Sequence, residues 1–555
     1  MLIVVIRQDY FDLAPIDRTD EGTRMRGSLW KRARRFAPLL ASVMWLALAG
    51  CGSTGPSATS AADRDETRDM FVTGMSDIDA VYIDRVDLGD IAAAGLKRLD
   101  EIDPSVALVR AGSKLELEIG GKEVAIFEAP APDAAADWGV LAAGYVEAAR
   151  QASPKLADAP NEKIYETVFD GMVSKLDGFS RYASAADAAE NRASREGFGG
   201  IGVRVAVADG KVRIVSVMNY TPAQRAGLQP DDIITAIDGQ EVAGLDQRNV
   251  IDELRGPVGS RVELTVQRGD TGAPLTVTLS RAHVVPETVV YHPEGNVAYF
   301  HVYGFNSDTA ESFAREISHA KAEIGPDLSG IVLDLRGDPG GLLDEAVAVA
   351  DLFMQDGRIV STHGRHPDSH QYFEATAGDV ADGRPIVVLI NGNSASASEI
   401  VAAALQDSGR AVVVGSNSYG KGTVQTVLRL PNSGELTLTW ARFHAPSGYT
   451  LNKLGVLPSI CTSGRDAREL IADLRNGRLR PIPIAQRNAL VPTDTAAMNR
   501  LRQSCPQVKS EPSGDLDVAL ALIRQPLLYA KALALGEPLS PAVSAEAAAV
   551  TGSQP

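Results

Sequence analysis

Hydrophobic and polar residues follow one another in blocks whose periods predict the secondary structure of this chain. The run from Ile386 to Ile390 is short, β-branched and wholly apolar, which predicts a strand buried on both faces. From Ser398 to Gln406 the residues have good helix propensity, and no Gly or Pro interrupts them. The small polar residues between these two stretches, Asn391 to Ala397, therefore lie where a buried strand ends and a helix begins.

The same alternation extends through the second half of the chain from Asn296 onward. Strands are predicted at residues 297–302, 330–335, 412–415 and 437–443, and helices at 308–324 and 341–354. Strands that alternate with helices form βαβ crossovers, which place the strands parallel in one sheet. The predicted fold class is therefore α/β for this half of the chain.

The remaining parts of the chain have other periods. Residues 66–108 have apolar positions at near-helical spacing, and the alternation from Leu115 to Phe127, with a turn at Gly120-Gly121, predicts a β-hairpin. Residues 138–192 are again helical in pattern. After Cys461 one strong helix is predicted, over residues 516–535, interrupted at Pro526.

The front of the chain has the layout of an export signal. A basic stretch opens at Met25, and the apolar run that follows it is too short to span a membrane and ends at Cys51. Leu48 to Cys51 resembles the bacterial lipoprotein cleavage box, in which the cysteine is lipidated. We therefore expect a periplasmic protein anchored by lipid at Cys51, and Gly52 favours the outer membrane. A plain signal peptide cut elsewhere is the alternative.

Net charge and cysteine count restrict the partners and the compartment. A net charge of −17 excludes sequence-independent binding to nucleic acid. The chain has three cysteines, and lipidation of Cys51 leaves Cys461 and Cys505 as a pair for a disulfide in an oxidising compartment. Two unpaired thiols remain the alternative.

Two stretches carry candidate chemistry. A serine at the start of the helix after Ile390 would lie beside free backbone N–H groups, which can hold a developing negative charge. An ordinary serine helix cap would give the same pattern. Downstream, Lys421 lies between Gly420 and Gly422 in apolar surroundings. Burial can lower the pKa of a lysine by as much as ~3–5 units, which is enough to make it a general base.

Three segments in order resemble the carboxyl-terminal processing proteases, also called tail-specific proteases. They are Asp334 to Gly341, Ser394 to Ile400 and Gly415 to Gln425. The resemblance implies a Ser–Lys serine peptidase with a crotonase-like, Clp-protease-like α/β core. It assigns the nucleophile to Ser396 and the base to Lys421.

The same resemblance implies two supporting roles. Gln425 would orient Lys421. The oxyanion hole would consist of the N–H of Ala397 and that of one glycine after Pro339, for which Gly340 is preferred and Gly341 stays open.

An earlier segment resembles a PDZ domain. Phe198 to Val203 is glycine-rich, and Thr221 to Ile234 contains the Pro-Ala-x-x-Ala-Gly-Leu pattern in register. Such domains add a peptide strand to a sheet edge and hold its terminal carboxylate in a backbone nest. The expected partners are therefore protein or peptide substrates with free C-termini, bound by this group: Phe198, Gly199, Gly200, Ile201, Gly202 and Val203.

The predicted domain organisation follows from these segments. The full assignment is 1–24 a start extension that is not native, 25–50 signal peptide, 51–65 tether, 66–135 accessory unit, 137–194 helical part of the protease, 195–285 PDZ domain, 286–460 peptidase core and 461–555 C-terminal extension with a disordered tail.

No cofactor or metal is expected. The spacing of His363, His366 and His370 suggests a zinc site, but their loop composition, without a carboxylate–histidine helix pattern, argues against one.

The predicted function is a periplasmic, lipid-anchored serine endopeptidase that selects substrates through their C-termini and acts through an acyl-enzyme. An adaptor lipoprotein is a further candidate partner. Two alternatives come from other classes: an inert lipoprotein scaffold that binds C-termini through the PDZ domain, and a crotonase-type acyl-CoA enzyme. A set of Ser396, Lys421 and Gln425 would be superfluous in either.

Overall fold

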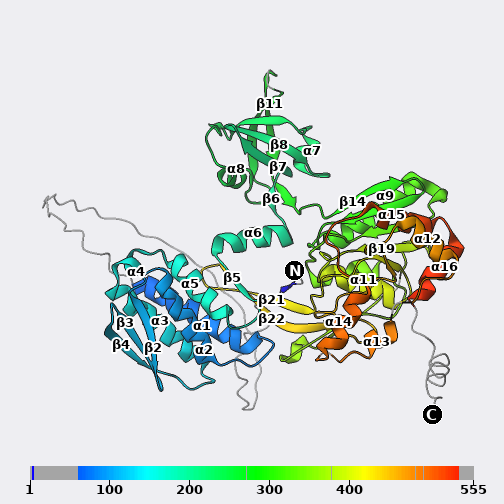
Figure 1. Cartoon of the computed structure of the whole chain (residues 1–555). Helices are drawn as coiled ribbons and strands as arrows, with labels where there is room; N and C mark the ends of the chain where they lie inside the picture. The colour runs from blue at the N-terminus through cyan, green and yellow to red at the C-terminus, as the bar shows by residue number, and fades with distance from the viewer. Residues whose placement is uncertain are drawn as a thin grey trace, which may run out of the picture.

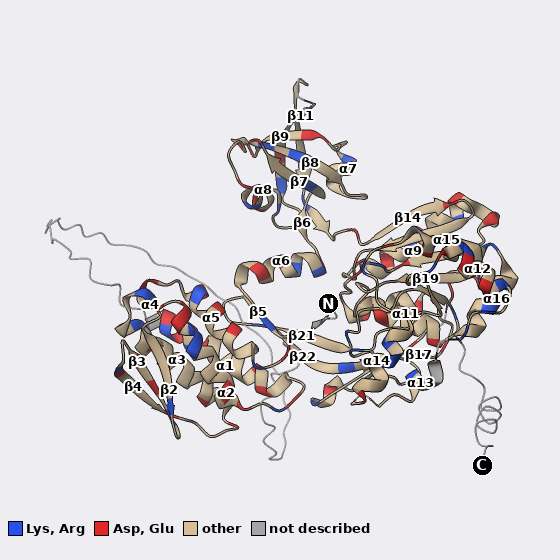
Figure 2. Cartoon of the chain, in the orientation of Figure 1, with Lys and Arg blue, Asp and Glu red and all other residues tan. Residues whose placement is uncertain are grey.

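The chain folds into three lobes around a central region (Figure 1). The computed structural model describes residues 3–5 and 61–536, apart from residues 270, 271, 377, 482 and 492. The predicted signal peptide, residues 51–60 of the predicted tether, which include Cys51, and the tail after residue 536 lie outside the described residues. The prediction of a tether is wrong for residues 61–65, which begin the first helix. Acidic and basic residues are interspersed along all three lobes (Figure 2).

The N-terminal lobe packs helices against a small antiparallel sheet. Its main helices are α1 (Ala61–Val81), α2 (Leu88–Lys97), α3 (Ala135–Ala152) and α5 (Asn161–Val173), and the sheet orders β2 (Val106–Ala111), β3 (Lys114–Ile119) and β4 (Lys122–Glu128). The shorter α4 (Pro154–Asp158) and η2 (Arg98–Glu101) connect them. The predicted hairpin is β3 and β4. The prediction of helix up to Leu108 is wrong, because residues from Val106 pair with β3.

The upper lobe in Figure 1, called the PDZ lobe here, is a twisted antiparallel sheet with one flanking helix. Its strands follow the order β12 (Pro274–Ser280), β11 (Arg261–Arg268), β9 (Asp232–Ile237), β8 (Lys211–Val217) and β7 (Val203–Ala208), and β10 (Gln240–Glu241) pairs with β9. Helix α8 (Gln247–Leu254) lies beside β7, and the short α7 (Pro222–Arg225) follows β8.

A narrow ribbon joins the PDZ lobe to the rest of the protein. Strand β6 (Phe198–Gly200) enters the lobe after α6 (Ala185–Glu196), and β13 (Ala282–Val284) leaves it, antiparallel to β6. On the other side of the ribbon, Arg195 of α6 forms a buried ion pair with Glu435, whose two carboxylate oxygens lie 2.9 and 3.2 Å from its guanidinium nitrogens. Helix α6 is thus fixed to the second half of the chain at Glu435.

The third lobe is built on a mainly parallel sheet. Its order is β14 (Val289–Glu294), β15 (Val297–Val302), β16 (Gly330–Asp334), β19 (Ile386–Ile390), β20 (Val412–Gly415) and β23 (Ile460–Cys461), and only the β14–β15 pair is antiparallel. Side chains that alternate along these strands, such as Val388 and Ile390, pack into one core together with helices α9 (Thr309–Ile324), α10 (Leu343–Asp351) and α11 (Ala397–Asp407). The predicted alternation of strands and helices is thus observed.

The second face of this sheet is covered by the C-terminal extension. Val387 and Leu389 pack with α12 (Ala467–Arg475), α15 (Ser513–Ile523) and α16 (Pro526–Leu535). A parallel sheet requires cover on both faces, so the extension completes the peptidase core. The boundary predicted at residue 460 stays a prediction, and it separates two segments that pack on the same sheet. The prediction of a single helix here also missed α12, α13 (Ile484–Asn488) and α14 (Thr495–Ser504).

A second, largely antiparallel sheet lies beside the core. It orders β1 (Ile3–Val5), β21 (Thr423–Arg429), β22 (Glu435–His444), β17 (Arg358–Gly364) and β18 (Gln371–Glu374), with β5 (Arg181–Ala183) on β22. Strand β1 runs parallel to β21, with Ile3 opposite Gln425. The short η3 (Gly325–Asp327) and η4 (Pro367–Ser369) lie in loops.

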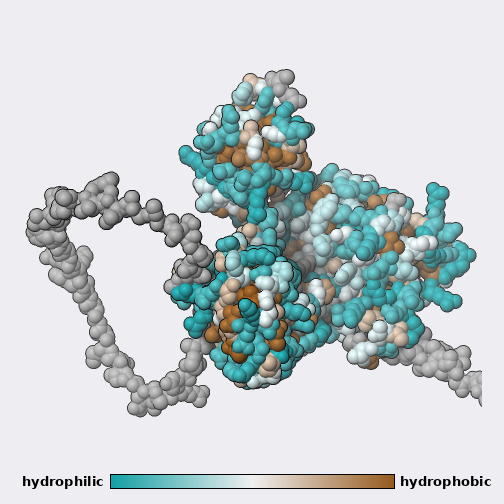
Figure 3. All heavy atoms as spheres, turned by 60° about the vertical axis from the view of Figure 1, so that its left-hand side comes forward, coloured by the Kyte–Doolittle hydropathy of each residue, from teal (hydrophilic) through white to brown (hydrophobic). Residues whose placement is uncertain are grey.

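The described residues contain no single helix long and apolar enough to cross a membrane. The bent pair Gly514–Ile523 and Pro526–Leu535, at 114° to one another, meets that test only when both halves are taken together. In Figure 3 hydrophilic residues cover most of the surface, and the more apolar areas lie on the PDZ lobe and the N-terminal lobe.

Candidate active site

Ser396 is buried at a strained turn between β19 and α11. It is the residue immediately before the helix, with φ 65° and ψ −110°, and its side chain is 0% exposed. A non-glycine residue with positive φ costs about 1–3 kcal/mol and persists only where its surroundings hold it. The hydroxyl of Ser396 has no hydrogen-bond partner among the described residues. This oxygen is therefore held in place by the backbone and is free to react.

The loop before Ser396 is tied to the end of β16. Ser394 donates its hydroxyl to Leu335 O at 2.8 Å, and Ala395 N donates to Asp338 O at 3.0 Å. Ser398 donates its hydroxyl to the same Asp338 oxygen at 2.9 Å. These bonds fix the strained turn on both sides of the nucleophile candidate.

A single buried carboxylate connects this loop to the one that carries Lys421. Glu399 Oε2 accepts hydrogen bonds from the N–H of Ser396 at 2.8 Å and from that of Lys421 at 2.9 Å. Its Oε1 accepts from Gly420 N at 2.7 Å and from the Ser418 hydroxyl at 2.5 Å. Burial raises the pKa of Glu399 to about 7, although these hydrogen bonds favour the carboxylate. The backbones of Ser396 and Lys421 are therefore held against the same group.

Lys421 lies in an apolar environment that favours its neutral form. Its side chain is 6% exposed, and Nζ lies 4.9 Å from the centre of the Phe179 ring. Burial, helped by the charge of Arg181, lowers the pKa of Lys421 to about 8, against the opposing charges of Glu399 and Asp177. A substantial fraction of this amine is therefore neutral near neutral pH and can accept a proton.

Gln425 lies on β21 and has its amide nitrogen already bonded. Nε2 donates to the hydroxyls of Thr423 at 2.9 Å and Thr439 at 3.2 Å, whereas Oε1 is buried without a partner among the described residues. Its free acceptor is suited to an ammonium group. The predicted role of Gln425 in orienting Lys421 stays a prediction.

The backbone N–H of Gly340, the preferred oxyanion donor, already makes a hydrogen bond within the protein. The N–H of Gly340 donates to Asp338 Oδ1 at 2.7 Å, so in this structure it is not available to an oxyanion, and the preference for Gly340 is corrected. The N–H groups of Gly341 and Ala397 make no hydrogen bond to the described part of the chain. A Cβ on Gly340 would lie 2.8 Å from Ala397 N and 2.9 Å from Ser396 Cβ, so the glycine is still required for close packing.

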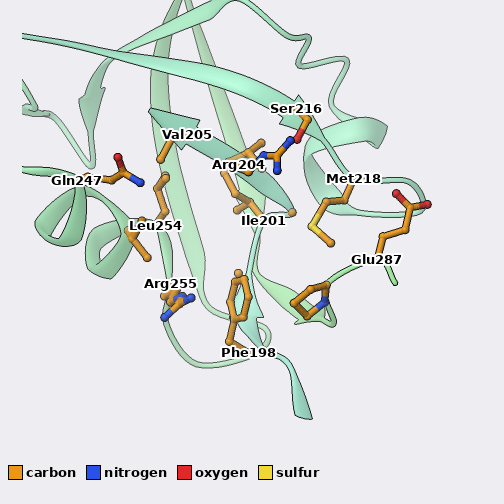
Figure 4. A pocket seen from close by; sticks show the side chains of 15 residues that line it. Phe198, Ile201, Arg204, Val205, Ser216, Met218, Gln247, Leu254, Arg255 and Glu287 are labelled. Atoms are coloured by element: carbon orange, nitrogen blue, oxygen red, sulfur yellow. The ribbon is translucent and has the colours of Figure 1, made fainter. Parts of the chain in front are cut away.

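The PDZ lobe carries a groove of about 400 Å³ along its edge strand β7 (Figure 4). Ile201 and Leu254 lie on opposite sides of it, and the guanidinium of Arg255 stacks 4.2 Å from the Phe198 ring centre at one end. The N–H groups of Ile201 and Gly202 make no hydrogen bond to a described residue.

The predicted nest is therefore divided between two roles. Ile201 and Gly202 have free donors, and Val203 begins β7. In contrast, Phe198, Gly199 and Gly200 form β6 and pair with β13. Phe198 and Gly200 nevertheless line the groove together with Ile201, Gly202 and Val203, and binding of a carboxylate by this group stays a prediction.

The other predicted site residues lie elsewhere. Cys461 and Cys505 are joined by a disulfide, 44 residues apart in sequence. His363 and His370 approach each other, with their Nδ1 atoms 3.4 Å apart. Among the residues that the structure describes, no group of three or more His, Cys, Asp or Glu side chains is arranged to hold a metal ion.

Sequence analysis missed two residues that shape this site. Glu399 is three residues after Ser396, which is the spacing of a capping box, so a signal for it was present. Phe179 comes from the N-terminal half of the chain, and no local pattern indicated that it would lie over Lys421.

Comparison with known proteins identifies the family. Residues 296–462 match Peptidase family S41, and residues 213–268 match the PDZ domain. A carboxy-terminal-processing protease of Bartonella bacilliformis is 41% identical over 302 residues, which cover 54% of this chain and 70% of that protein. This chain belongs to the carboxy-terminal processing proteases.

Other members of the family have related sequences. Carboxy-terminal processing protease CtpB of Bacillus subtilis is 34% identical over 312 residues, which cover 55% of this chain and 64% of that protein. A solved photosystem II D1 C-terminal processing protease superposes with a TM-score of 0.36 at 24% identity, over 71% of this chain and 92% of that one. This carboxy-terminal processing protease is a serine protease with a mixed α/β core, an inserted PDZ domain and an N-terminal helical region, as the sequence predicted.

Replacement of Phe179 tests the cause of the low lysine pKa. Phe179→Ala would admit water to Lys421, so the pKa that governs the rise of kcat/KM with pH should move upward from about 8. Phe179→Leu keeps the apolar cover and should leave the profile close to that of the parent enzyme. Peptide hydrolysis at pH 6 to 10 gives both profiles, and an unchanged profile for Phe179→Ala would contradict the explanation.

Proposed function

We propose that this carboxy-terminal processing protease is a lipid-anchored periplasmic endopeptidase that uses Ser396 and Lys421 and selects substrates by their C-termini. The observation that carries the catalytic part is the carboxylate of Glu399, which holds the backbone N–H groups of both residues at 2.8 and 2.9 Å. A nucleophile without a bonded partner and a lysine of lowered pKa lie on the two loops that it joins.

The chemistry follows from these groups. Neutral Lys421 takes the proton of the Ser396 hydroxyl as the oxygen attacks the scissile carbonyl carbon. The N–H of Ala397, with Gly341 as the second donor, stabilises the oxyanion. Protonated Lys421 then gives its proton to the leaving amine, and the ester bond to Ser396 remains. Water, deprotonated by Lys421, releases the acyl group. The free Oε1 of Gln425 is suited to accept a hydrogen bond from the ammonium form.

The PDZ groove supports selection through a C-terminus. A peptide added to the free edge of β7 would place its terminal carboxylate at Ile201 and Gly202, whose N–H groups lack described partners. Its last side chain would lie in the apolar part of the groove, beside Leu254. These features favour an unstructured peptide with an apolar C-terminal residue.

The edge of β21 supports an extended substrate path. β1 lies parallel along this edge, opposite residues 425–427, which shows that the edge can accept a further strand. A mature chain that begins at Cys51 would lack β1 and leave this edge open for a substrate strand beside Gln425.

Exchange of Lys421 for arginine tests the dyad. A guanidinium stays protonated and cannot take the serine proton, so Lys421→Arg should lower kcat/KM by at least about 100-fold at every pH from 6 to 10. Ser396→Ala should abolish labelling by a fluorophosphonate probe. Circular dichroism checks the fold of both variants. Near-normal hydrolysis by Lys421→Arg would mean that another group activates Ser396.

Peptide titration tests recognition of the C-terminus. A peptide with a free, apolar C-terminal residue should bind the protein at least about tenfold more tightly than its amidated form, because a charged carboxylate accepts stronger hydrogen bonds from the two N–H groups than a neutral amide does. Binding is measured by fluorescence anisotropy with the Ser396→Ala protein, which cannot consume the peptide. Equal affinities would remove the carboxylate from the recognition mechanism.

Cys51→Ser tests the anchor, which rests on the sequence alone. The parent protein should fractionate with membranes and take up labelled fatty acid, and the variant should do neither. A variant that stays membrane-bound with an unchanged N-terminus would contradict the anchor.

A further inference from the structure

A segment of the C-terminal extension lies against both catalytic loops. This segment, residues 506–512 between α14 and α15, is called the strap. Its first contact is with the loop that precedes Ser396: Val508 O accepts a hydrogen bond from Gly392 N at 2.7 Å. Lys509 O accepts from the side-chain amides of Asn391 and Asn393 at 3.2 and 3.1 Å.

The strap also binds the loop that leads to Lys421. Val508 N donates to the Ser416 hydroxyl at 3.0 Å, and that hydroxyl lies 3.2 Å from Val508 O. The side-chain amide of Gln507 donates to Ser418 O. Ser418 itself is bonded to Glu399, the carboxylate that joins the two catalytic loops. Glu399 and the strap therefore each connect the same two loops. Glu399 does so as a buried side chain between them, and the strap does so as a separate segment of the chain packed against them.

Both ends of the strap are fixed. At its start, Cys505 is joined to Cys461, the last residue of β23. At its end, the buried guanidinium of Arg336, next to the Asp334 carboxylate, donates to Pro512 O at 2.9 Å and lies 3.3 Å from Asp515 Oδ2. At the start of the strap, Cys461 and Cys505 line a cavity of about 570 Å³.

We propose that the strap positions the loops that carry Ser396 and Lys421 for catalysis. The Cys461–Cys505 disulfide fixes the start of the strap, and full activity requires this disulfide. The proposal rests on the assignment of Ser396 and Lys421 under the proposed function. Its physical basis is that a nucleophile displaced by even ~1 Å can lose about 100-fold in rate, whereas substrate binding at β21 and the PDZ groove involves other residues.

Gln507→Ala is the first test, with Gln525→Ala as a matched control. Gln525 lies in the same extension but accepts its side-chain hydrogen bonds from Arg475, away from the catalytic loops. Gln507→Ala should lower kcat about three- to tenfold with KM within about twofold, since it loosens positioning and leaves substrate contacts intact. Gln525→Ala should leave both constants unchanged.

The second test removes the disulfide. The full-length Cys461→Ser/Cys505→Ser protein, and the parent enzyme reduced with a phosphine, should lose at least about tenfold in kcat. Their kcat/KM profiles should shift to higher pH, because a loosened loop admits water to Lys421. Circular dichroism and thermal melting establish which proteins are folded, and if the double variant is not folded, Gln507→Ala decides.

The outcomes separate this proposal from the one on which it rests. Parent-like kcat and pH profile in Gln507→Ala and in the folded disulfide variant would overturn the strap proposal, as would an equal loss in Gln525→Ala. Ser396→Ala is assayed alongside: if it still hydrolyses peptide, the dyad assignment fails, whatever the strap variants do. An inactive Ser396→Ala beside fully active strap variants would overturn the strap proposal alone.

Discussion

The parallel sheet of the peptidase lobe must have both faces covered, and the rest of this structure depends on that requirement. Its strands are apolar at successive positions, so Val388 and Ile390 require cover on one face and Val387 and Leu389 on the other. Helices from before β20 cover the first face, and helices from the end of the chain cover the second. The C-terminal extension is therefore part of the same folded core. The extension also contacts the first face, where Arg487 donates hydrogen bonds to Gln406 and Asp407 at the end of α11.

Two opposite demands meet at the reactive centre. Ser396 and Lys421 must be buried, since exposure would protonate the lysine and relax the turn, but buried backbone N–H groups require partners. Glu399 satisfies three of these N–H groups with one carboxylate. The cost is a charge in an apolar site, which is reflected in the raised pKa of Glu399. The same exclusion of water thus lowers the pKa of Lys421 and strengthens the hydrogen bonds by which Glu399 holds the two loops.

Local patterns in the sequence were sufficient for the central elements. The apolar run at 386–390 and the helix-forming residues after Ser396 predicted β19 and α11, and three short motifs identified Ser396 and Lys421 as candidates. Features that depend on distant residues were not predictable: Phe179 over Lys421, and helices α12 and α15 on the sheet. Residues 106–108 were misassigned because Val106 lies four residues after Ile102 and so continues the helical spacing, although Val106 and Leu108 are two residues apart, as in a strand. The occupation of Gly340 N–H depends on the orientation of one side chain, Asp338, which no pattern encodes.

The order of these parts along the chain has a consequence for synthesis. Ser396 and Lys421 emerge from the ribosome well before Gln507 to Asp515, and before the helices that cover the second face of the sheet. A growing chain therefore contains Ser396 and Lys421 before the strap can contact their loops. At that stage the second face of the parallel sheet also has no helices to cover it. The second face of the sheet can be covered only after these final helices have been synthesised and have docked. On the strap proposal, the two loops gain their external support at the same late stage.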